Sequence, residues 1–515
     1  MKKNGITLCV LTRDEAELLP RLLRSTRGVA DETIVLDTGS TDGTPEVARS
    51  FGARVLHHPF EDDFSAVRNV ALEAARNAWI LVLDADEVLS PGAASRIRRA
   101  ARDPQKAGYF LRFENDLGGG RTHVCGLIRF FRNDPAVRYE FVLHEQVVPS
   151  LLEFARARGM RLGVVEGVTV YHDGYRPDRK AAKGKEERNE RLFRRQLERY
   201  PDHVYSWYKF GDFLRQVPGR GAEARSALER AASLLRGMDS KEADVLSFPS
   251  EVFALLALEE DKAGKPANAL AIAREGLERH GESPNLLHVL AHLYRKAGAY
   301  REAFRASRRL REYEHRLLAV PPEPGITGAG AWFGMGFALL ELGRARGARR
   351  CFDRCLQANP SHLAARLALA RAHLLDGAVE AACLQYEAAL SIDPAQPMVR
   401  LQFGQALLHL GRAEDAEQQF EAAARSGPLG PLATAKTGEA RLAQGDLEGA
   451  YRCFLEAGSL PDAVAGRQIL EALARGEDPA EKAAAGTPAG QRVVRYLRTV
   501  GFPVGADSSR EDPIA

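Results

Sequence analysis

Four glycines in the C-terminal half of the chain recur at one fixed interval, and this periodicity restricts the possible folds more than any other feature. Each glycine follows the previous one by 34 residues, and series of a small residue, an aromatic residue and a proline keep the same interval. Such a period predicts stacked helical units, because one unit buries its apolar face only against its neighbours. The series are Gly343, Gly377, Gly411 and Gly445; Ala348, Ala382, Ala416 and Ala450; Phe352, Tyr386, Phe420 and Phe454; and Pro360, Pro394 and Pro428.

The 34-residue unit, with a turn glycine, a small residue, an aromatic residue and a closing proline, resembles the tetratricopeptide repeat. An earlier pair, Gly264 and Gly298, keeps the period, and the segments 207–211 and 332–336 have the form W-x-x-x-G of that family's first helix. The resemblance implies an all-α solenoid from about residue 200 to 475. A proline-rich stretch at 319–330 divides it into two blocks.

The N-terminal third has a different sequence pattern, in which short β-branched apolar runs alternate with helical stretches. This pattern predicts an α/β domain with a mostly parallel sheet between helices. In such sheets ligands bind beyond the carboxyl ends of the strands. Polar residues follow three of the expected strands, and we expect them to meet at one edge of the sheet.

One of these strand ends, WILVLDADE at 79–87, places Asp84, Asp86 and Glu87 directly after a buryable run. An isolated D-x-D is often a helix cap, a solvated turn or a surface ion-pair cluster. Two carboxylates at a strand end in an α/β domain also suit Mg²⁺ or Mn²⁺, which keeps waters and phosphate oxygens as further ligands.

Four motifs in order, ITLCVLTRDE, ETIVLDTGSTDGT, DDFSAVRNVAL and WILVLDADE, resemble the nucleotide-sugar-binding half of family 2 glycosyltransferases. The resemblance covers about residues 5 to 175 and implies a GT-A-type fold and an inverting transfer. With the repeats, the chain is similar to bacterial members that carry them at the C-terminus. We expect a GT-A-type domain at 1–178, a basic linker helix at 179–203, repeat blocks at 204–318 and 329–475, and a tail at 476–515.

The resemblance implies roles for the residues that bind the donor. Thr12 and Arg13 would lie near the uracil or other base, and Asp37 would accept a hydrogen bond from the base or ribose. The family often has a second aspartate beside Asp37, where this chain has Thr38. The expected donor is a nucleotide sugar, with a UDP-sugar as the family's usual choice.

Arg68 and Asn69 would face the nucleotide, and the always charged fork of Arg68 suits the diphosphate. The alternative for Arg68 is a salt bridge to Asp62 or Asp63. Two basic residues of the linker helix, Lys183 and Arg188, could reach the diphosphate if that segment folds over the site.

In the acidic motif, the resemblance implies that Asp86 coordinates the divalent metal directly. Asp84 would bind the ribose, or the metal through water. His172, after the last expected strand of the domain, would complete the metal or diphosphate shell as a neutral imidazole.

A transfer with inversion needs a general base beside the acceptor hydroxyl. The pattern R-Y-E-x-x-x-H-E at 138–145 resembles one that recurs in repeat-bearing relatives. We interpret Glu145 as the candidate base and His144 as a positioning or diphosphate-contacting group, the alternative being that both belong to a polar network.

Charge and cysteine content restrict the classes of partner and the cellular compartment that we expect. The net charge of +3 gives no argument for nucleic acid or an anionic membrane as a partner. Six cysteines without a CxxC pair fit core packing in a reducing cytoplasm, and no run of 18 apolar residues predicts a transmembrane segment. We expect the protein in the cytoplasm or at the inner face of the membrane.

The sequence therefore predicts a metal-dependent glycosyltransferase. A groove of stacked helices commonly binds peptide, so a peptide or protein acceptor recruited by the repeats is the first hypothesis. Lipopolysaccharide or another glycan is the alternative acceptor. A non-catalytic tetratricopeptide scaffold is the alternative from another class.

Overall fold

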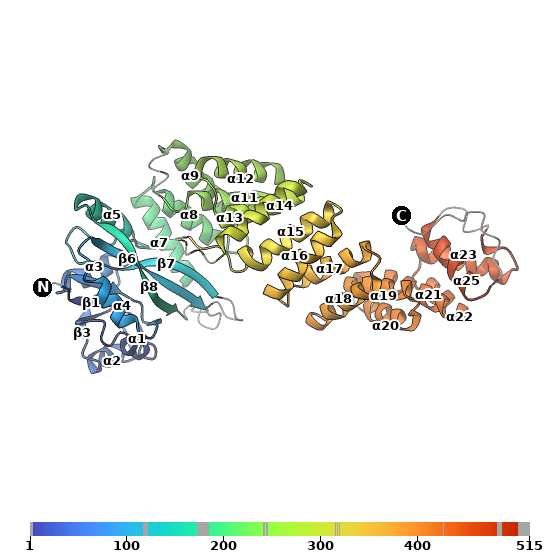
Figure 1. Cartoon of the computed structure of the whole chain (residues 1–515), viewed down its shortest axis with the longest axis horizontal. Coiled ribbons are helices and arrows are strands. Elements are labelled where there is room, and N and C mark those ends of the chain that lie inside the picture. Colours follow the sequence, from blue (N-terminus) through green and yellow to red (C-terminus); the bar gives the residue numbers. More distant parts are fainter. Residues whose placement is uncertain are drawn as a thin grey trace. The chain divides into compact units, whose positions relative to one another are not determined.

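The computed structural model groups the chain into two compact units (Figure 1). One unit comprises Met1–Gly298 and Arg309–Thr327, and the other comprises Ala299–Arg308 and Gly328–Ala515. The first repeat helices thus share a unit with the N-terminal domain, and the five-segment division predicted from the sequence stays a prediction. The structure describes residues 4–116, 122–172, 185–239, 243, 246–314, 316, 318, 320–425, 427–480 and 487–502.

Within the described residues of the first unit, eight strands form one sheet in the order β3-β2-β1-β4-β7-β6-β8-β5. The pairs from β3 to β4 and the pair of β6 with β8 are parallel. The other pairs are antiparallel, so the sheet is mixed, and the expected parallel pattern holds in its first four strands. The strands are β1 (Ile6–Thr12), β2 (Glu32–Asp37), β3 (Arg54–His57), β4 (Trp79–Val82), β5 (Glu87–Leu89), β6 (Lys106–Asp116), β7 (Thr122–Arg132) and β8 (Arg161–His172).

The central strands are buried apolar runs whose polar ends meet at one edge. All four residues of β4 are buried, and β1 is buried except for Leu11. In the register of the sheet Thr12 lies beside Asp37 and Cys9 beside Val82. The residues that follow β4 therefore lie beside the end of β1, as the strand-end pattern predicted.

Helices cover both faces of the sheet, and each face has its own apolar core. One core surrounds Trp79 and Phe113 and includes residues of α1, α2 and α4, while the other surrounds Phe131 and includes residues of α3 and α5. The carboxylate of Asp63 caps α3 by accepting a hydrogen bond from the Ala66 amide over 3.0 Å. The helices are α1 (Leu19–Ser25), α2 (Thr44–Ser50), α3 (Phe64–Ala74), α4 (Ala93–Ala100) and α5 (Val148–Ala157).

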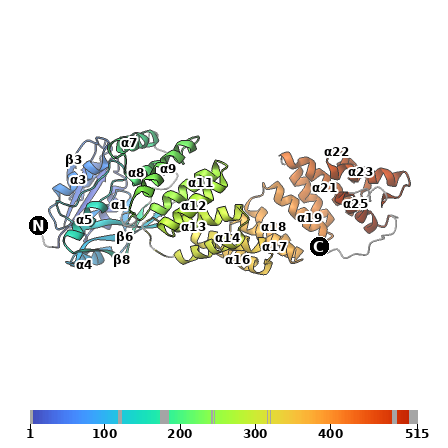
Figure 2. The same ribbon diagram turned by 90° about the horizontal axis from the view of Figure 1, so that it is seen from above.

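The remainder of the described chain is helical, and most consecutive helices pack against one another (Figures 1 and 2). In the first unit lie α7 (Lys185–Arg199), α8 (Val204–Leu214), α9 (Gly221–Gly237), α11 (Pro249–Lys262), α12 (Pro266–His280), α13 (Pro284–Lys296) and the short η1 (Arg311–Tyr313). The others are α14 (Tyr300–Leu310), η2 (Ile326–Gly330), α15 (Ala331–Glu341), α16 (Ala345–Ala358), α17 (Leu363–Leu375), α18 (Val379–Ile392), α19 (Pro397–His409), α20 (Ala413–Ala424), η3 (Gly427–Leu429), α21 (Gly430–Ala443), α22 (Leu447–Glu456), α23 (Pro461–Ala474) and α25 (Pro488–Thr499).

The periodic residues occupy the positions that a helical repeat requires. The four glycines of the 34-residue series end helices with positive φ angles, a conformation that costs glycine little. The small residues of the series are fully buried, and the buried rings of Phe352, Phe420 and Phe454 lie against glycines of neighbouring helices. The predicted all-α repeat architecture is thus confirmed.

The described helices include none with the length and apolar character needed to cross a membrane. All six cysteines are free and buried. Their expected place in the core is therefore confirmed.

Candidate functional site

A cavity of about 860 Å³ opens where the ends of β1 and β4 meet α3 and α7. Most of the residues that the sequence singled out line it, together with two phenylalanines, Phe60 and Phe64, that no motif indicated. Arg188 of α7 also lines it, whereas Lys183 lies outside the described residues. The predicted site residues along its wall are Thr12, Arg13, Arg68, Asp84, Asp86, His144 and Glu145.

The acidic motif forms a tight turn between β4 and β5. Glu87 begins β5 and closes the turn, because its carboxylate accepts the Asp84 amide over 2.9 Å. None of the three carboxylates caps a helix. Glu87 is 2% exposed, and burial raises its pKa to about 7 against the opposing charge of Arg129.

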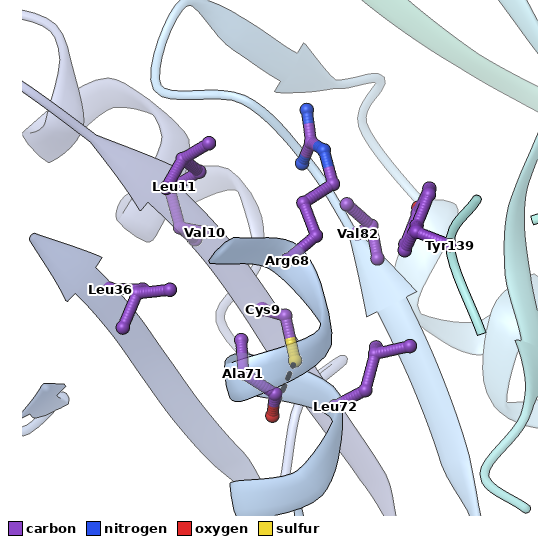
Figure 3. Close-up of a pocket in the computed structure, with 9 residues that line it drawn as sticks. All are labelled: Cys9, Val10, Leu11, Leu36, Arg68, Ala71, Leu72, Val82 and Tyr139. Atoms are coloured by element: carbon purple, nitrogen blue, oxygen red, sulfur yellow. Dashed lines mark hydrogen bonds between the residues drawn. The ribbon is translucent and has the colours of Figure 1, made fainter. Parts of the chain in front are cut away.

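Arg68 binds two carboxylates at the floor of the cavity. Its Nε donates to Glu145 over 2.6 Å, and an Nη donates to Asp84 over 2.9 Å. The alternative pairing with Asp62 or Asp63 is not found; those residues pair with Arg191 and Arg199. The guanidinium of Arg68 points away from Cys9 and Ala71, and the side chain shares a small apolar pocket with Leu11, Val82 and Tyr139 (Figure 3).

A second arginine, Arg129 of β7, completes this network. It donates to Asp84 over 3.2 Å and to Glu87 over 3.4 Å. Although burial works against ionisation, Arg68 and Arg129 hold the pKa of Asp84 well below its usual range. No sequence motif indicated Arg129, but an arginine inside the apolar run LIRFF is a signal, because a charge in a central strand requires a buried partner.

Asp86 and His172 form a separate pair. The carboxylate of Asp86 lies 3.2 Å from Nε2 of His172, and Nδ1 of His172 lies 2.9 Å from the amide oxygen of Asn115. Burial alone would lower the pKa of His172, but its hydrogen bond to Asp86 and the neighbouring carboxylates raise it. The strand pairing of Glu87 with His172 brings the two motifs together, although 85 residues separate them in the sequence.

The donor set at this pair fits a divalent cation that shares its shell with phosphate. The described residues hold no group of three or more His, Cys, Asp or Glu side chains arranged for a metal. Mg²⁺ is commonly held by one or two carboxylates, with phosphate oxygens and waters in the other positions. Asp86 offers one such carboxylate beside the imidazole of His172, whereas both oxygens of Asp84 are engaged by arginines.

Three predicted site residues, Asp37, Asn69 and His172, lie outside the cavity lining, and the first two serve the local backbone. The carboxylate of buried Asp37 accepts hydrogen bonds from the amides of Gly39 and Ser40 and from the Ser40 hydroxyl. Asn69 pairs with both backbone groups of Tyr139, donating to its carbonyl over 2.9 Å and accepting from its amide over 2.8 Å.

His144 and Glu145 lie on a short loop, residues 140–146, which we call the 140–146 loop. Glu140 and Gln146 close it with two backbone hydrogen bonds of 2.9 and 3.0 Å. Oε1 of Glu145 faces Arg68, and among the described residues Oε2 of Glu145 accepts no hydrogen bond. Surrounding protein, together with the charge of Lys209, lowers the pKa of His144 to about 4, so its imidazole is neutral at physiological pH even where the cavity exposes it.

The comparisons with known proteins agree with this architecture. Residues 7–135 match the model of glycosyl transferase family 2, and residues 333–397 and 401–464 match a tetratricopeptide repeat model. A TPR repeat-containing protein of Synechococcus elongatus is 39% identical over 212 residues, 41% of this chain and 52% of the relative. The SPbeta prophage-derived glycosyltransferase SunS of Bacillus subtilis is 25% identical over 215 residues, 40% of this chain and 48% of the relative.

An uncharacterized glycosyltransferase of Rickettsia bellii is 39% identical over 85 residues, 16% of this chain and 29% of the relative. The chain spans about half the length of the first two relatives. The family matches cover the sheet domain and the later repeats, which are also the two parts that the sequence motifs distinguish. Residues 7–135 thus match glycosyl transferase family 2, and tetratricopeptide repeats follow this domain in the chain.

Proposed function

We propose that the protein is a glycosyltransferase that moves a sugar from a nucleotide-sugar donor to an acceptor. The observation that carries this proposal is the 860 Å³ cavity, in which Asp84, Asp86, Arg68 and Glu145 meet at the strand ends of a family 2 domain. A cavity of this size suits a ligand as large as a nucleotide sugar. Fixed charges at its floor suit a reaction in which a diphosphate departs.

In this proposal the cavity divides between base, diphosphate and acceptor. Thr12 and Arg13 border the end that would take the base. Arg188 supplies a cation for the diphosphate from α7, and the neutral imidazole of His144 supplies a hydrogen-bond donor. Arg68 is already shared between two carboxylates, so we propose that it sets the positions of Asp84 and Glu145 as well as facing the nucleotide.

For Asp37 and Asn69, direct contact with the nucleotide stays a prediction. The hydrogen bonds of Asp37 support a role in shaping the turn after β2, which adjoins the cavity at Thr38. Those of Asn69 support a role in holding Tyr139 at the start of the segment that carries Glu145.

We further propose that the reaction depends on Mn²⁺ or Mg²⁺ held by Asp86 and His172. A bound divalent cation would stabilise the charge that develops on the departing nucleoside diphosphate. The proximity of the two side chains supports this choice. In this proposal Asp84 does not contact the metal directly, because Arg68 and Arg129 engage its two oxygens. It acts through those arginines or through a water, which agrees with the indirect role expected from the motif.

Glu145 is the proposed general base of an inverting transfer. Its Oε2 is open to accept the proton of an acceptor hydroxyl, while the bond from Arg68 to Oε1 fixes the orientation of the carboxylate. Inversion requires the acceptor to approach the sugar from the face opposite the diphosphate. Nuclear magnetic resonance of the product would establish its anomeric configuration.

The acceptor that we propose is a peptide or protein recruited by the repeats, because helical repeat surfaces commonly bind extended chains. A lipopolysaccharide core or other glycan is the second candidate acceptor. Transfer of a labelled sugar by the full chain to peptides, compared with transfer to core oligosaccharides, separates the two. The buried free thiols support a reducing compartment, so cytoplasm, including the inner face of the membrane, is the proposed location.

The test of the function is donor hydrolysis by the full chain across a panel of nucleotide sugars, with Mn²⁺, Mg²⁺ or a chelator. We expect slow, metal-dependent release of one nucleoside diphosphate, and its loss in Asp86→Ala. The exposed Glu46→Ala on α2 serves as a control and should behave as the wild type. Absence of turnover together with absence of nucleotide binding would leave the non-catalytic scaffold as the function.

A further inference from the structure

The 140–146 loop has a backbone that its own sequence does not favour. Phe141 and His144 have positive φ angles of 74° and 54°, in the left-handed region that bulky residues rarely adopt. Such conformations persist only where the surroundings impose them, and they gather at functional sites. Some part of the structure must therefore hold this loop in place.

Helices α7 and α8 pack against the loop and share one apolar core with its Val142 and Leu143. The ring of Phe141 stacks on His203, which precedes α8, with centroids 4.0 Å apart. His144 contacts Phe193 of α7, with ring centroids 5.5 Å apart. From the sheet domain, the amide of Phe64 donates to the carbonyl of Val142 over 3.0 Å.

The most specific contact comes from Gln196 of α7, which is 1% exposed. Its side-chain oxygen accepts the amide of Leu143 over 2.7 Å, and its side-chain nitrogen donates to the hydroxyl of Ser206 over 2.6 Å. That hydroxyl in turn lies 2.7 Å from Nδ1 of His203. Gln196 thus fixes the middle of the loop to α7 and α8, the first two described helices that follow the sheet domain.

We propose that Gln196 is a positioning residue that holds the 140–146 loop in the shape that presents Glu145 to the acceptor. This inference rests on the proposed function of Glu145. It also makes α7 and α8 part of the catalytic unit, although both lie outside the 7–135 match to the glycosyltransferase family. A helix that served only as a linker would carry its polar side chains on a solvent-exposed face. The side-chain amide of Gln196 is buried and hydrogen-bonded, so a linker role alone does not account for it.

The test compares Gln196→Leu with Gln196→Glu in the full chain. Leucine has a similar size but accepts no hydrogen bond from the Leu143 amide. Glutamate keeps an oxygen for that amide, and Ser206 can donate to its other oxygen, although a buried charge lowers stability. Three quantities are measured for each variant: hydrogen exchange at the Leu143 amide, kcat and KM for the donor, and the melting temperature.

We expect Gln196→Leu to speed exchange at Leu143 and to lower kcat by about ten- to a hundredfold while the donor KM changes little, because the base is displaced and the donor contacts remain. Gln196→Glu should recover most of kcat even though it melts lower than Gln196→Leu. Unchanged exchange in Gln196→Leu, or a loss of kcat that follows melting temperature across both variants, would overturn the proposal. If the wild type turned over no donor, the proposed function would fail, and the exchange result would still decide whether Gln196 holds the loop.

Discussion

Nε of Arg68 donates to Oε1 of Glu145 over 2.6 Å. The two residues are 77 positions apart in the sequence, and the bond joins the helix after β3 to the 140–146 loop. The same guanidinium binds Asp84, so one side chain ties the proposed base to the acidic motif. A change at Arg68 should therefore affect both ends of the cavity together.

Arg68→Lys should lower kcat/KM for the donor by about a hundredfold, because one ammonium group replaces a planar fork that serves two carboxylates. Arg68→Met should lower the free energy of unfolding by about 3 kcal/mol, the lower end for a buried ion pair, since Asp84 is 31% exposed. Steady-state kinetics and urea unfolding measure the two effects. Wild-type kinetics in Arg68→Lys would exclude the bridging role.

Asn69→Leu should lower the free energy of unfolding by about 1–3 kcal/mol, because it leaves the amide and carbonyl of Tyr139 without their partners. Glu73→Ala, an exposed site on the same helix, serves as the control and should change stability by about 0.5 kcal/mol or less. Thermal unfolding measures both. Unchanged stability of Asn69→Leu with weakened nucleotide binding would instead support the direct contact that the family resemblance implied.

The sequence predicted part of the site but not the partners that hold its side chains in place. Strand-end placement predicted that Thr12, Asp84 and Asp86 gather at one edge, because parallel strands share a direction. The partners of those side chains come from later segments that no local pattern connects to the motif. Arg129 and Gln196 lie in a strand and a helix whose spatial neighbours depend on the antiparallel half of the sheet and on the packing of α7.

Gly404→Ala should destabilise the repeats by about 1–3 kcal/mol through overpacking, because an added Cβ would lie 2.5 Å from the ring of Phe420. Gln402→Ala, an exposed change on α19, is the matched control and should have little effect. Thermal unfolding followed by circular dichroism compares them. Equal melting of Gly404→Ala and the wild type would contradict the close helix packing described for this repeat.

The native protein should react slowly with Ellman's reagent at about pH 8, because burial raises the pKa of Cys9 to about 12 and that of Cys351 to about 11. After denaturation all six thiols should react at once. Absorbance of the released thiolate counts them. A thiol that reacts rapidly in the folded protein would contradict its place in the core.

The repeat half was more predictable than the sheet domain for a physical reason. A fixed period specifies the neighbour of every unit, so the turn glycines and buried aromatic residues could be identified from spacing alone. A second small-residue series, Gly336, Ala370, Gly404 and Gly438, has the same period and went unnoticed. In the sheet domain the alternation of strands and helices predicted the parallel strands, whereas the antiparallel pairing of β4 with β7 and of β5 with β8 depends on long-range contacts that leave no periodic signal.

The most direct test of the central claim is calorimetric titration of the full chain with a panel of nucleoside diphosphates, with Mn²⁺ or with chelator, for the wild type and Asp86→Ala. It requires no acceptor and measures the cation and diphosphate site itself. The account predicts that one nucleoside diphosphate binds with Mn²⁺ and loses affinity about tenfold or more both with chelator and in Asp86→Ala. Binding that is equally tight with chelator and in the variant would contradict it.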